Sequence, residues 1–133
     1  MNLTHKRHFV AAQRSHEQQS FRLELCKLYK PDIGLILGQI AKWAKGEPPG
    51  KDYENYSNIY PGLGRWRIGN YRIYTYHLGG NVYIMLHVYK KSEQGLPQPV
   101  KKKIIDRAII YEDHQRALDL EKYKAVLRGA VSL

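Results

Sequence analysis

Gly64 to Lys91 read GRWRIGNYRIYTYHLGGNVYIMLHVYKK, and this stretch decides the fold. It holds three runs in which apolar and polar side chains alternate, separated by Gly69-Asn70 and by Gly79-Gly80. Each of these pairs is typical of a two-residue turn between antiparallel strands. The stretch therefore predicts a three-stranded antiparallel meander.

The two turns predict which residues lie opposite one another. The first turn pairs Ile68 with Tyr71 and Arg67 with Arg72. It continues outward with Trp66 opposite Ile73 and Arg65 opposite Tyr74. The second turn is expected to give the pairs Tyr76 with Tyr83, Tyr74 with Met85, and Arg72 with His87.

Opposite residues share a face of a sheet, and neighbours along a strand alternate between faces. The face expected to form the core holds Trp66, Ile68, Ile73, Thr75, Ile84, Leu86 and Val88. The opposite face is expected to hold Arg65, Arg67, Arg72, Tyr74, Tyr76, Tyr83, Met85, His87 and Tyr89. All the cationic side chains of the meander interior therefore fall on one side.

Arg67 and Arg72 are like charges placed directly opposite one another, which costs roughly 0.2–1 kcal/mol. A sheet that needed only solubility has no reason to keep both. Two interpretations stay open. One is a solvated basic face whose tyrosines reflect strand propensity, and the other is an anion site with phosphate as its ligand.

The composition permits the second interpretation. The chain has 133 residues, enough for one domain with a real core, and we expect residues 1–133 to form it. Its net charge of +10 favours nucleic acid, ribosomes or an acidic partner protein. Cys26 is the only cysteine, so no disulfide framework is expected. No apolar run approaches a membrane span of about 18 residues and the N-terminus lacks a signal-peptide core, so we expect a cytoplasmic protein without membrane contact.

The segments before the meander predict two helices. Residues 1–14 are an uncertain basic arm or edge strand. A helix is expected over about 16–29, and a second follows Pro31-Asp32 and runs to about Lys45. The run of Gly and Pro at 46–50 ends the second helix.

The segments on either side of the meander complete the layout. Residues 51–63 are expected to be a connection with room for a short strand. Pro97 and Pro99 open a third helix, and 112–133 is expected to be its C-terminal extension. The fold class is therefore α+β, with an N-terminal helical hairpin packed on a small antiparallel sheet of three or four strands, plus a C-terminal helix.

The ordered motifs of the meander carry a family resemblance. They are Trp66-Arg67-Ile68, Tyr71-Arg72-Ile73-Tyr74, Leu86-His87-Val88-Tyr89, Lys90-Lys91 and Pro97, followed by Ala108. In this order, between a helical hairpin and a last helix, they resemble the RelE/ParE toxin superfamily and its phage-derived HigB-like branch. The resemblance implies a RelE-like fold and a toxin of a type II toxin–antitoxin system. Such a toxin is an endoribonuclease that needs no metal, cleaves mRNA on the ribosome, inhibits translation, and is held inactive by a cognate antitoxin protein.

The resemblance implies that Arg67 and Arg72 bind phosphate and that Lys91 belongs to the basic end of the last strand. Cleavage of RNA without a metal needs a base for the 2′-OH, positive charge at the phosphorus and an acid for the leaving 5′-oxygen. Imidazole exchanges protons near neutral pH, so His87 can be base or acid, and Lys91 can be the acid or an electrostatic contact. The candidate catalytic residues are Arg67, Arg72, His87 and Lys91.

The same face offers groups that bind RNA without reacting. Cationic side chains contact neighbouring phosphates, and tyrosine rings stack on unpaired bases. The candidate RNA-binding residues are Arg65, Tyr74, Tyr76, Tyr89 and Lys90. We expect no cofactor and no metal, since His5-x-x-His8 lacks nearby acidic or cysteine ligands.

Two alternatives stay open. A ParE-like protein with this fold and charge inhibits DNA gyrase by contact and has no ribonuclease chemistry. In the other alternative, the protein binds RNA or ribosomes without cleaving RNA. Salt-dependent binding without cleavage would indicate this alternative. The stretch from His87 to Lys91 favours the ribonuclease.

Overall fold

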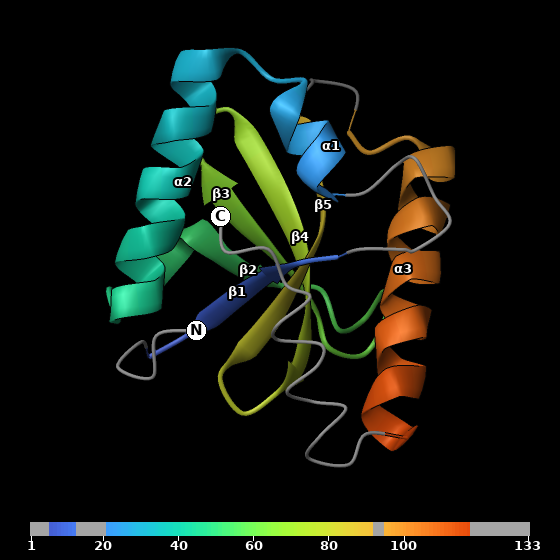
Figure 1. Cartoon of the computed structure of the whole chain (residues 1–133). Coiled ribbons are helices and arrows are strands. Elements are labelled where there is room, and N and C mark those ends of the chain that lie inside the picture. The colour runs from blue at the N-terminus through green and yellow to red at the C-terminus, as the bar shows by residue number, and fades with distance from the viewer. Residues whose placement is uncertain (1–5, 13–20, 92–94, 118–133) are drawn as a thin grey trace.

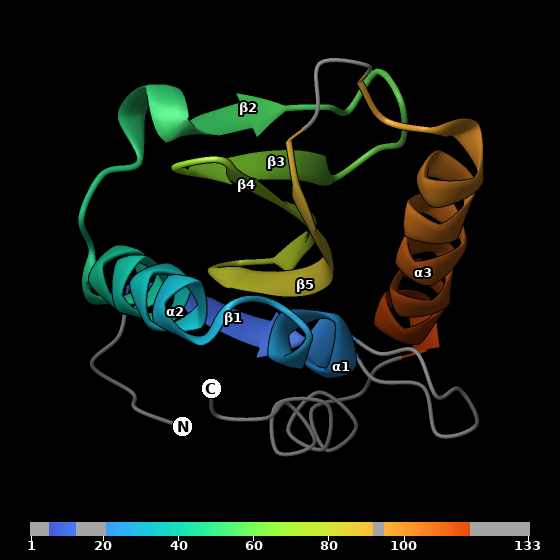
Figure 2. The ribbon, with the colours of Figure 1, turned by 90° about the horizontal axis from the view of Figure 1, so that it is seen from above.

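The computed structural model of the chain describes residues 6–12, 21–91 and 95–117. This part is an α+β fold with N-terminal helices, a five-stranded mixed sheet and a C-terminal helix (Figure 1). The elements are β1 (His8–Ala11), α1 (Phe21–Cys26), α2 (Lys30–Lys45), η1 (Gly50–Asp52), β2 (Tyr53–Asn55), β3 (Leu63–Ile68), β4 (Tyr71–Gly79), β5 (Val82–Lys90) and α3 (Gln98–Ala117). Figure 2 shows α2 and α3 on opposite sides of the sheet, and α1 packs against β5.

The sheet has the strand order β1-β5-β4-β3-β2. β1 runs parallel to β5, with His8 opposite Val82, and the other neighbours are antiparallel. The expectation of three or four antiparallel strands was therefore wrong. Of the two options for residues 1–14, the edge strand is what the structure shows over His8–Ala11. No turn sequence marks a pairing between segments so far apart, and β2 has only three residues, so neither edge had a clear local signal.

The first hairpin has the predicted register. Ile68 lies opposite Tyr71 and Arg67 opposite Arg72. Gly69 takes a φ of 55°, which a glycine adopts without steric cost. The like-charged pair is therefore a real neighbour pair in the sheet.

The second hairpin was predicted in the wrong register. Tyr74 lies opposite His87 rather than Met85, and Tyr76 lies opposite Ile84 rather than Tyr83. The turn falls at Gly80-Asn81, one residue later than expected, and the register shifts again between Tyr74 and Thr75. A shift of one residue turns a side chain to the other face.

Because the observed register differs from the predicted one, several β5 residues lie on the other face of the sheet. Ile84 and Leu86, expected on the Trp66 face, pack in the cluster beneath α3. Met85 and Tyr83, expected on the arginine face, pack in the cluster beneath α2 instead. Arg72 lies opposite Tyr89 rather than His87, but it keeps the predicted face, which it shares with Tyr74 and Arg67.

α2 covers the face of the sheet that carries Trp66. Pro31 lies in its first turn, where a missing N–H costs little. Ile36, Ile40 and Trp43 form its buried side, and the rings of Trp43 and Trp66 lie 4.8 Å apart. The helix ends before Gly46, whose φ of 118° is left-handed. The second predicted helix is confirmed, and α1 lies within the first, whose residues 16–20 fall outside the described part.

α3 covers part of the opposite face through Ile104 and Ala108. Pro99 is its second residue, as the sequence predicted. The helix includes the start of the expected extension at 112–133 and is described to Ala117, while 118–133 lie outside the described residues.

Candidate nucleic-acid interface

The three arginines of the first hairpin lie on the face of the sheet that α3 partly covers. Arg65 and Arg67 alternate with the buried Trp66 along β3, and Arg72 lies opposite Arg67 on β4. Their environments differ sharply. Arg72 is 4% exposed, whereas Arg65 and Arg67 are partly exposed.

Arg72 is held by the hairpin backbone. Its Nη1 donates to the carbonyls of Gly69 and Tyr71, both at 2.9 Å. Its Nε is buried and has no hydrogen-bond partner among the described residues. Burying a donor without a partner costs about 1–3 kcal/mol. This N–H is therefore well suited to donate to an anionic ligand.

Arg65 has a second buried Nε without a partner in the described part of the chain. Its Nη2 donates to Glu54 on β2 at 2.8 Å, and its guanidinium lies 5.0 Å from the centre of the Tyr56 ring. The hydrogen bond from Arg65 lowers the pKa of Glu54 despite a small opposing effect of burial. Arg65 is therefore partly neutralised and oriented by a carboxylate.

Arg67 is the most accessible of the three. Its Nε donates to Asp52 at 3.2 Å, and its Nη2 donates to the Lys51 carbonyl at 3.4 Å. Exposed ion pairs of this kind contribute at most about 1 kcal/mol. A phosphate can therefore replace Asp52 as the partner of Arg67 at little cost.

Aromatic rings connect the arginines to His87. The Tyr89 ring lies nearly parallel to those of Tyr74, at 6.0 Å, and His87, at 5.9 Å, and the Tyr56 ring meets Tyr74 edge-on. Of the tyrosines proposed to stack on bases, Tyr74 is only 3% exposed and Tyr76 only 5%. Burial raises the pKa of Tyr74. Their rings belong to the core, so Tyr89 and Tyr56 are the rings with accessible surface.

His87 belongs to a buried polar network whose centre is Glu24. Its Nδ1 is 2.9 Å from Oε2 of Glu24 on α1, and Oε1 of Glu24 accepts from Nη1 of Arg107 on α3 at 2.9 Å. Arg107 also donates to the Leu86 carbonyl, and Nζ of Lys103 is 3.7 Å from Glu24. Burial raises the pKa of Glu24, but hydrogen bonds from His87 and Arg107 outweigh it and leave the pKa below the ordinary value.

The two lysines at the C-terminal end of β5, Lys90 and Lys91, lie in different surroundings. Lys90 is opposite Tyr71 and lines a cavity of about 410 Å³ beneath α2 with Asp32 and Leu35, so it lies on the far side of the sheet from Arg72. Lys91 follows β5, is exposed, and donates its backbone N–H to Asn70. It shares the end of the sheet with Arg67 and Arg72.

Several residues of the site were not found from the sequence: Glu24, Asp52, Glu54, Tyr56 and Arg107. Arg107 had a signal, since it follows the apolar Ile104 by three positions and so lies on the buried side of α3. Glu24 had none, because nothing in α1 indicates that a carboxylate there meets β5.

The described residues show neither a metal site nor a membrane-spanning helix. No group of three or more His, Cys, Asp or Glu residues suited to a metal ion occurs in residues 6–12, 21–91 and 95–117. Over the same residues, no helix has the length and apolar character needed to cross a bilayer.

A scan against models of known protein families found no match for this chain, and a search of curated proteins found none either. The resemblance to the RelE/ParE superfamily therefore rests on the sequence motifs themselves.

Proposed function

We propose that this chain is a RelE-like toxin, an endoribonuclease that cleaves mRNA on the ribosome without a metal ion and is held inactive by a cognate antitoxin. The observation that carries the proposal is the buried Nε of Arg72, which has no hydrogen-bond partner among the described residues. It lies beside Tyr89 and on the same face of the sheet as Arg65, whose Nε also lacks a partner in the part of the chain that the structure describes. Guanidinium groups bind phosphate through charge-assisted and often bidentate hydrogen bonds.

Phosphate binding follows from this arrangement. Arg72 donates Nε–H to the scissile phosphate and stabilises the negative charge that builds up on its oxygens. Arg67 exchanges Asp52 for a second phosphate oxygen. Arg65 contacts a neighbouring phosphate, and the accessible ring of Tyr89 supports an unpaired base.

The proton transfers use two residues near the C-terminal end of β5, His87 and Lys91. His87 is diagonal to Arg72 across the β4–β5 pair, a separation of roughly 7–8 Å between Cα atoms. It takes the proton of the 2′-OH, the 2′-oxygen bonds to phosphorus, and the bond from phosphorus to the 5′-oxygen breaks. Lys91 gives a proton to the leaving 5′-oxygen. The products are a 2′,3′-cyclic phosphate and a 5′-OH end.

The test is cleavage of mRNA by the purified protein in EDTA, with and without translating ribosomes, with ends mapped by primer extension. Arg72→Ala is expected to lower the rate about 10²–10³-fold. Lys42→Ala removes one positive charge from the exposed surface of α2, away from the arginine face, and serves as the matched control. Folding of each variant is checked by circular dichroism.

Cleavage by a folded Arg72→Ala variant at the wild-type rate contradicts the proposal. Absence of cleavage by the wild type with and without ribosomes contradicts it too. In that case an assay of gyrase supercoiling decides whether the ParE-like alternative takes its place.

A further inference from the structure

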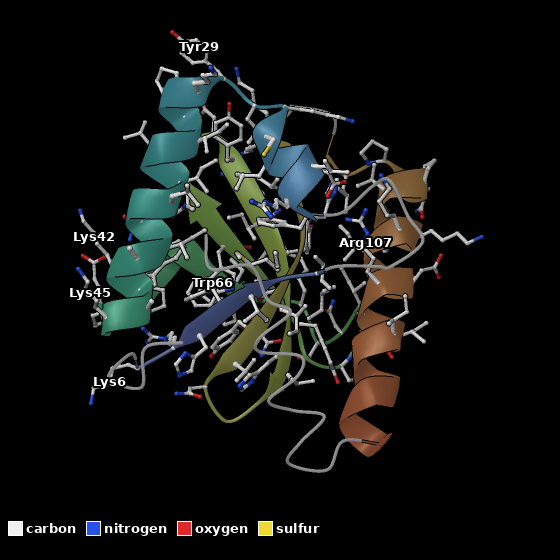
Figure 3. The ribbon with its side chains drawn as sticks, viewed as in Figure 1. Lys6, Tyr29, Lys42, Lys45, Trp66 and Arg107 are labelled. Atoms are coloured by element: carbon white, nitrogen blue, oxygen red, sulfur yellow. The ribbon has the colours of Figure 1, made fainter. Side chains whose placement is uncertain are left out.

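Three elements that are far apart in the sequence meet at one carboxylate. Glu24 of α1 contacts His87 of β5, 63 positions away, and Arg107 of α3, 83 positions away. Figure 3 shows Arg107 between α3 and the rest of the molecule. All three side chains are less than 15% exposed. A buried ionic network of this kind needs every hydrogen bond satisfied to offset desolvation.

The network determines where the hydrogen lies on the His87 ring. An ionised carboxylate only accepts hydrogen bonds. Hydrogen bonds to His87 and Arg107 keep the pKa of Glu24 low, which maintains the ionised form near neutral pH. The hydrogen shared by Glu24 and His87 therefore belongs to Nδ1, and in the neutral ring Nε2 carries a lone pair.

Nε2 is also the nitrogen that remains for a substrate. The hydrogen bond of His87 to a described residue is made through Nδ1. The groups that face the imidazole from the packed elements are Glu24 from α1, Lys103 and Arg107 from α3, and Tyr89 from β5. Among these, Glu24 is the acidic one, and its oxygens already accept from Arg107 as well as His87.

We propose that Glu24 is a positioning residue that fixes the hydrogen of His87 on Nδ1, so that Nε2 is the base of the reaction. This inference rests on the proposed ribonuclease function. When Nε2 takes the 2′-OH proton, the ring becomes a cation, and Glu24 stabilises it without accepting the proton itself. Arg107 holds the second oxygen of Glu24 and so keeps the carboxylate in place.

The first test needs no activity. The ¹⁵N and ¹H spectra of the full chain distinguish the two neutral forms of a histidine ring, and His87→Gln identifies the signals of His87. We expect the wild-type ring to carry its hydrogen on Nδ1. In Glu24→Leu, which has no acceptor, the hydrogen moves to Nε2 in a large share of molecules. A wild-type ring protonated on Nε2, or a Glu24→Leu ring unchanged from wild type, overturns the proposal.

Glu24→Gln covers the case in which Glu24→Leu fails to fold. Its amide oxygen can still accept from Nδ1 but, being neutral, stabilises the imidazolium less than a carboxylate does. We expect the wild-type ring form to persist, while kcat falls about 10- to 100-fold with KM unchanged and the pH dependence of kcat shifts. The matched control is Glu47→Gln, which changes an exposed carboxylate after α2.

The outcomes separate the two proposals. A wild-type protein that cleaves no RNA refutes the proposed function and with it the catalytic role of Glu24, while the spectra still decide where the hydrogen lies. Cleavage by the wild type together with normal kcat and pH dependence in Glu24→Gln refutes the positioning role and leaves the ribonuclease standing.

Discussion

At the scale of single residues, Arg72 is the most informative side chain. Its guanidinium is buried beneath the hairpin, two of its hydrogen bonds go to backbone carbonyls, and its Nε–H has no partner in the described residues. Solubility does not explain a buried arginine, and a satisfied structural role does not explain the unpaired donor. A buried polar group that is left unsatisfied in a native structure calls for an explanation, and a bound ion or a catalytic role is among the usual ones.

Arg72→Lys tests whether the shape of this group matters in addition to its charge. Lysine keeps the positive charge but loses Nε–H and the planar fork that matches phosphate. We expect RNA binding to weaken at least about tenfold, measured by fluorescence anisotropy with a short single-stranded RNA. Equal affinity of the lysine variant and the wild type means that Arg72 acts through charge alone.

The lowered pKa of Glu24 predicts that the stability of the protein depends on pH in the acid range. Its pKa in the folded chain is below the ordinary 4.5, so the unfolded chain binds the proton more readily. Its contribution to the free energy of unfolding is complete above pH 4.5 and is lost as the pH falls through the folded pKa. Urea unfolding between pH 3 and 6 measures this contribution. The free energy of unfolding of Glu24→Gln is expected to fall less steeply with decreasing pH than that of the wild type.

The control for that series is Glu47→Gln, which alters an exposed carboxylate outside the network. If the free energy of unfolding falls with decreasing pH as steeply in Glu24→Gln as in the wild type, other carboxylates cause the acid sensitivity.

At the scale of elements, the two hairpins show what sequence can and cannot predict. Gly69-Asn70 sets the first register, so the shared face of Arg67 and Arg72 was correctly predicted. Gly79-Gly80-Asn81 allows two positions for a turn, and the register shift near Tyr74 has no signal of its own. The faces of β5 were therefore predicted correctly only near its end.

In the candidate site, too, contacts within a hairpin could be predicted and contacts between separate elements could not. The arginines come from neighbouring strands joined by a short turn, and the turn sequence brings them together. Glu24 and Arg107 reach His87 only through the packing of α1 and α3 against β5. Contacts between separate elements depend on how they dock, which no local pattern in this chain encodes.

α2 gives a prediction about helix stability. Gly34 and Gly38 are exposed within the helix, and a Cβ added at either has nothing within 4 Å. Alanine at each position restricts the unfolded chain and is expected to raise the free energy of unfolding by about 0.5–1 kcal/mol. Chemical denaturation measures the change, and a destabilised variant contradicts the exposed placement of these glycines.

β3 gives the opposite prediction at Gly64. A Cβ there lies 2.5 Å from the ring of Tyr53 on β2, which itself packs on Trp66 at 4.6 Å. Gly64→Ala therefore has to displace Tyr53 and is expected to cost about 1–3 kcal/mol. The α2 glycine variants are its natural comparison, measured under the same conditions.

At the scale of the whole molecule, the net charge of +10 adds a general attraction for polyanions to the specific contacts of the site. Binding of RNA is therefore expected to weaken steeply with salt, because each neutralised phosphate releases counterions. Arg67→Ala should lower the slope of log K against log salt by about 0.7, the value for one phosphate on a single strand. The Lys42→Ala variant should leave the slope nearly unchanged, and equal slopes in all three proteins would place Arg67 outside the RNA path.

The parallel pairing of β1 with β5 has a consequence for how the chain is made. β1 and Glu24 leave the ribosome first, yet their partners lie on β5, and Arg107 follows later still. Loops this long close slowly relative to local hairpins. During synthesis, the first hairpin can therefore form with its arginines in register while His87 still lacks both Glu24 and the support of α3. The network around His87 is completed only when α3 has emerged, so a nascent chain carries the arginine face before it carries the network that holds His87.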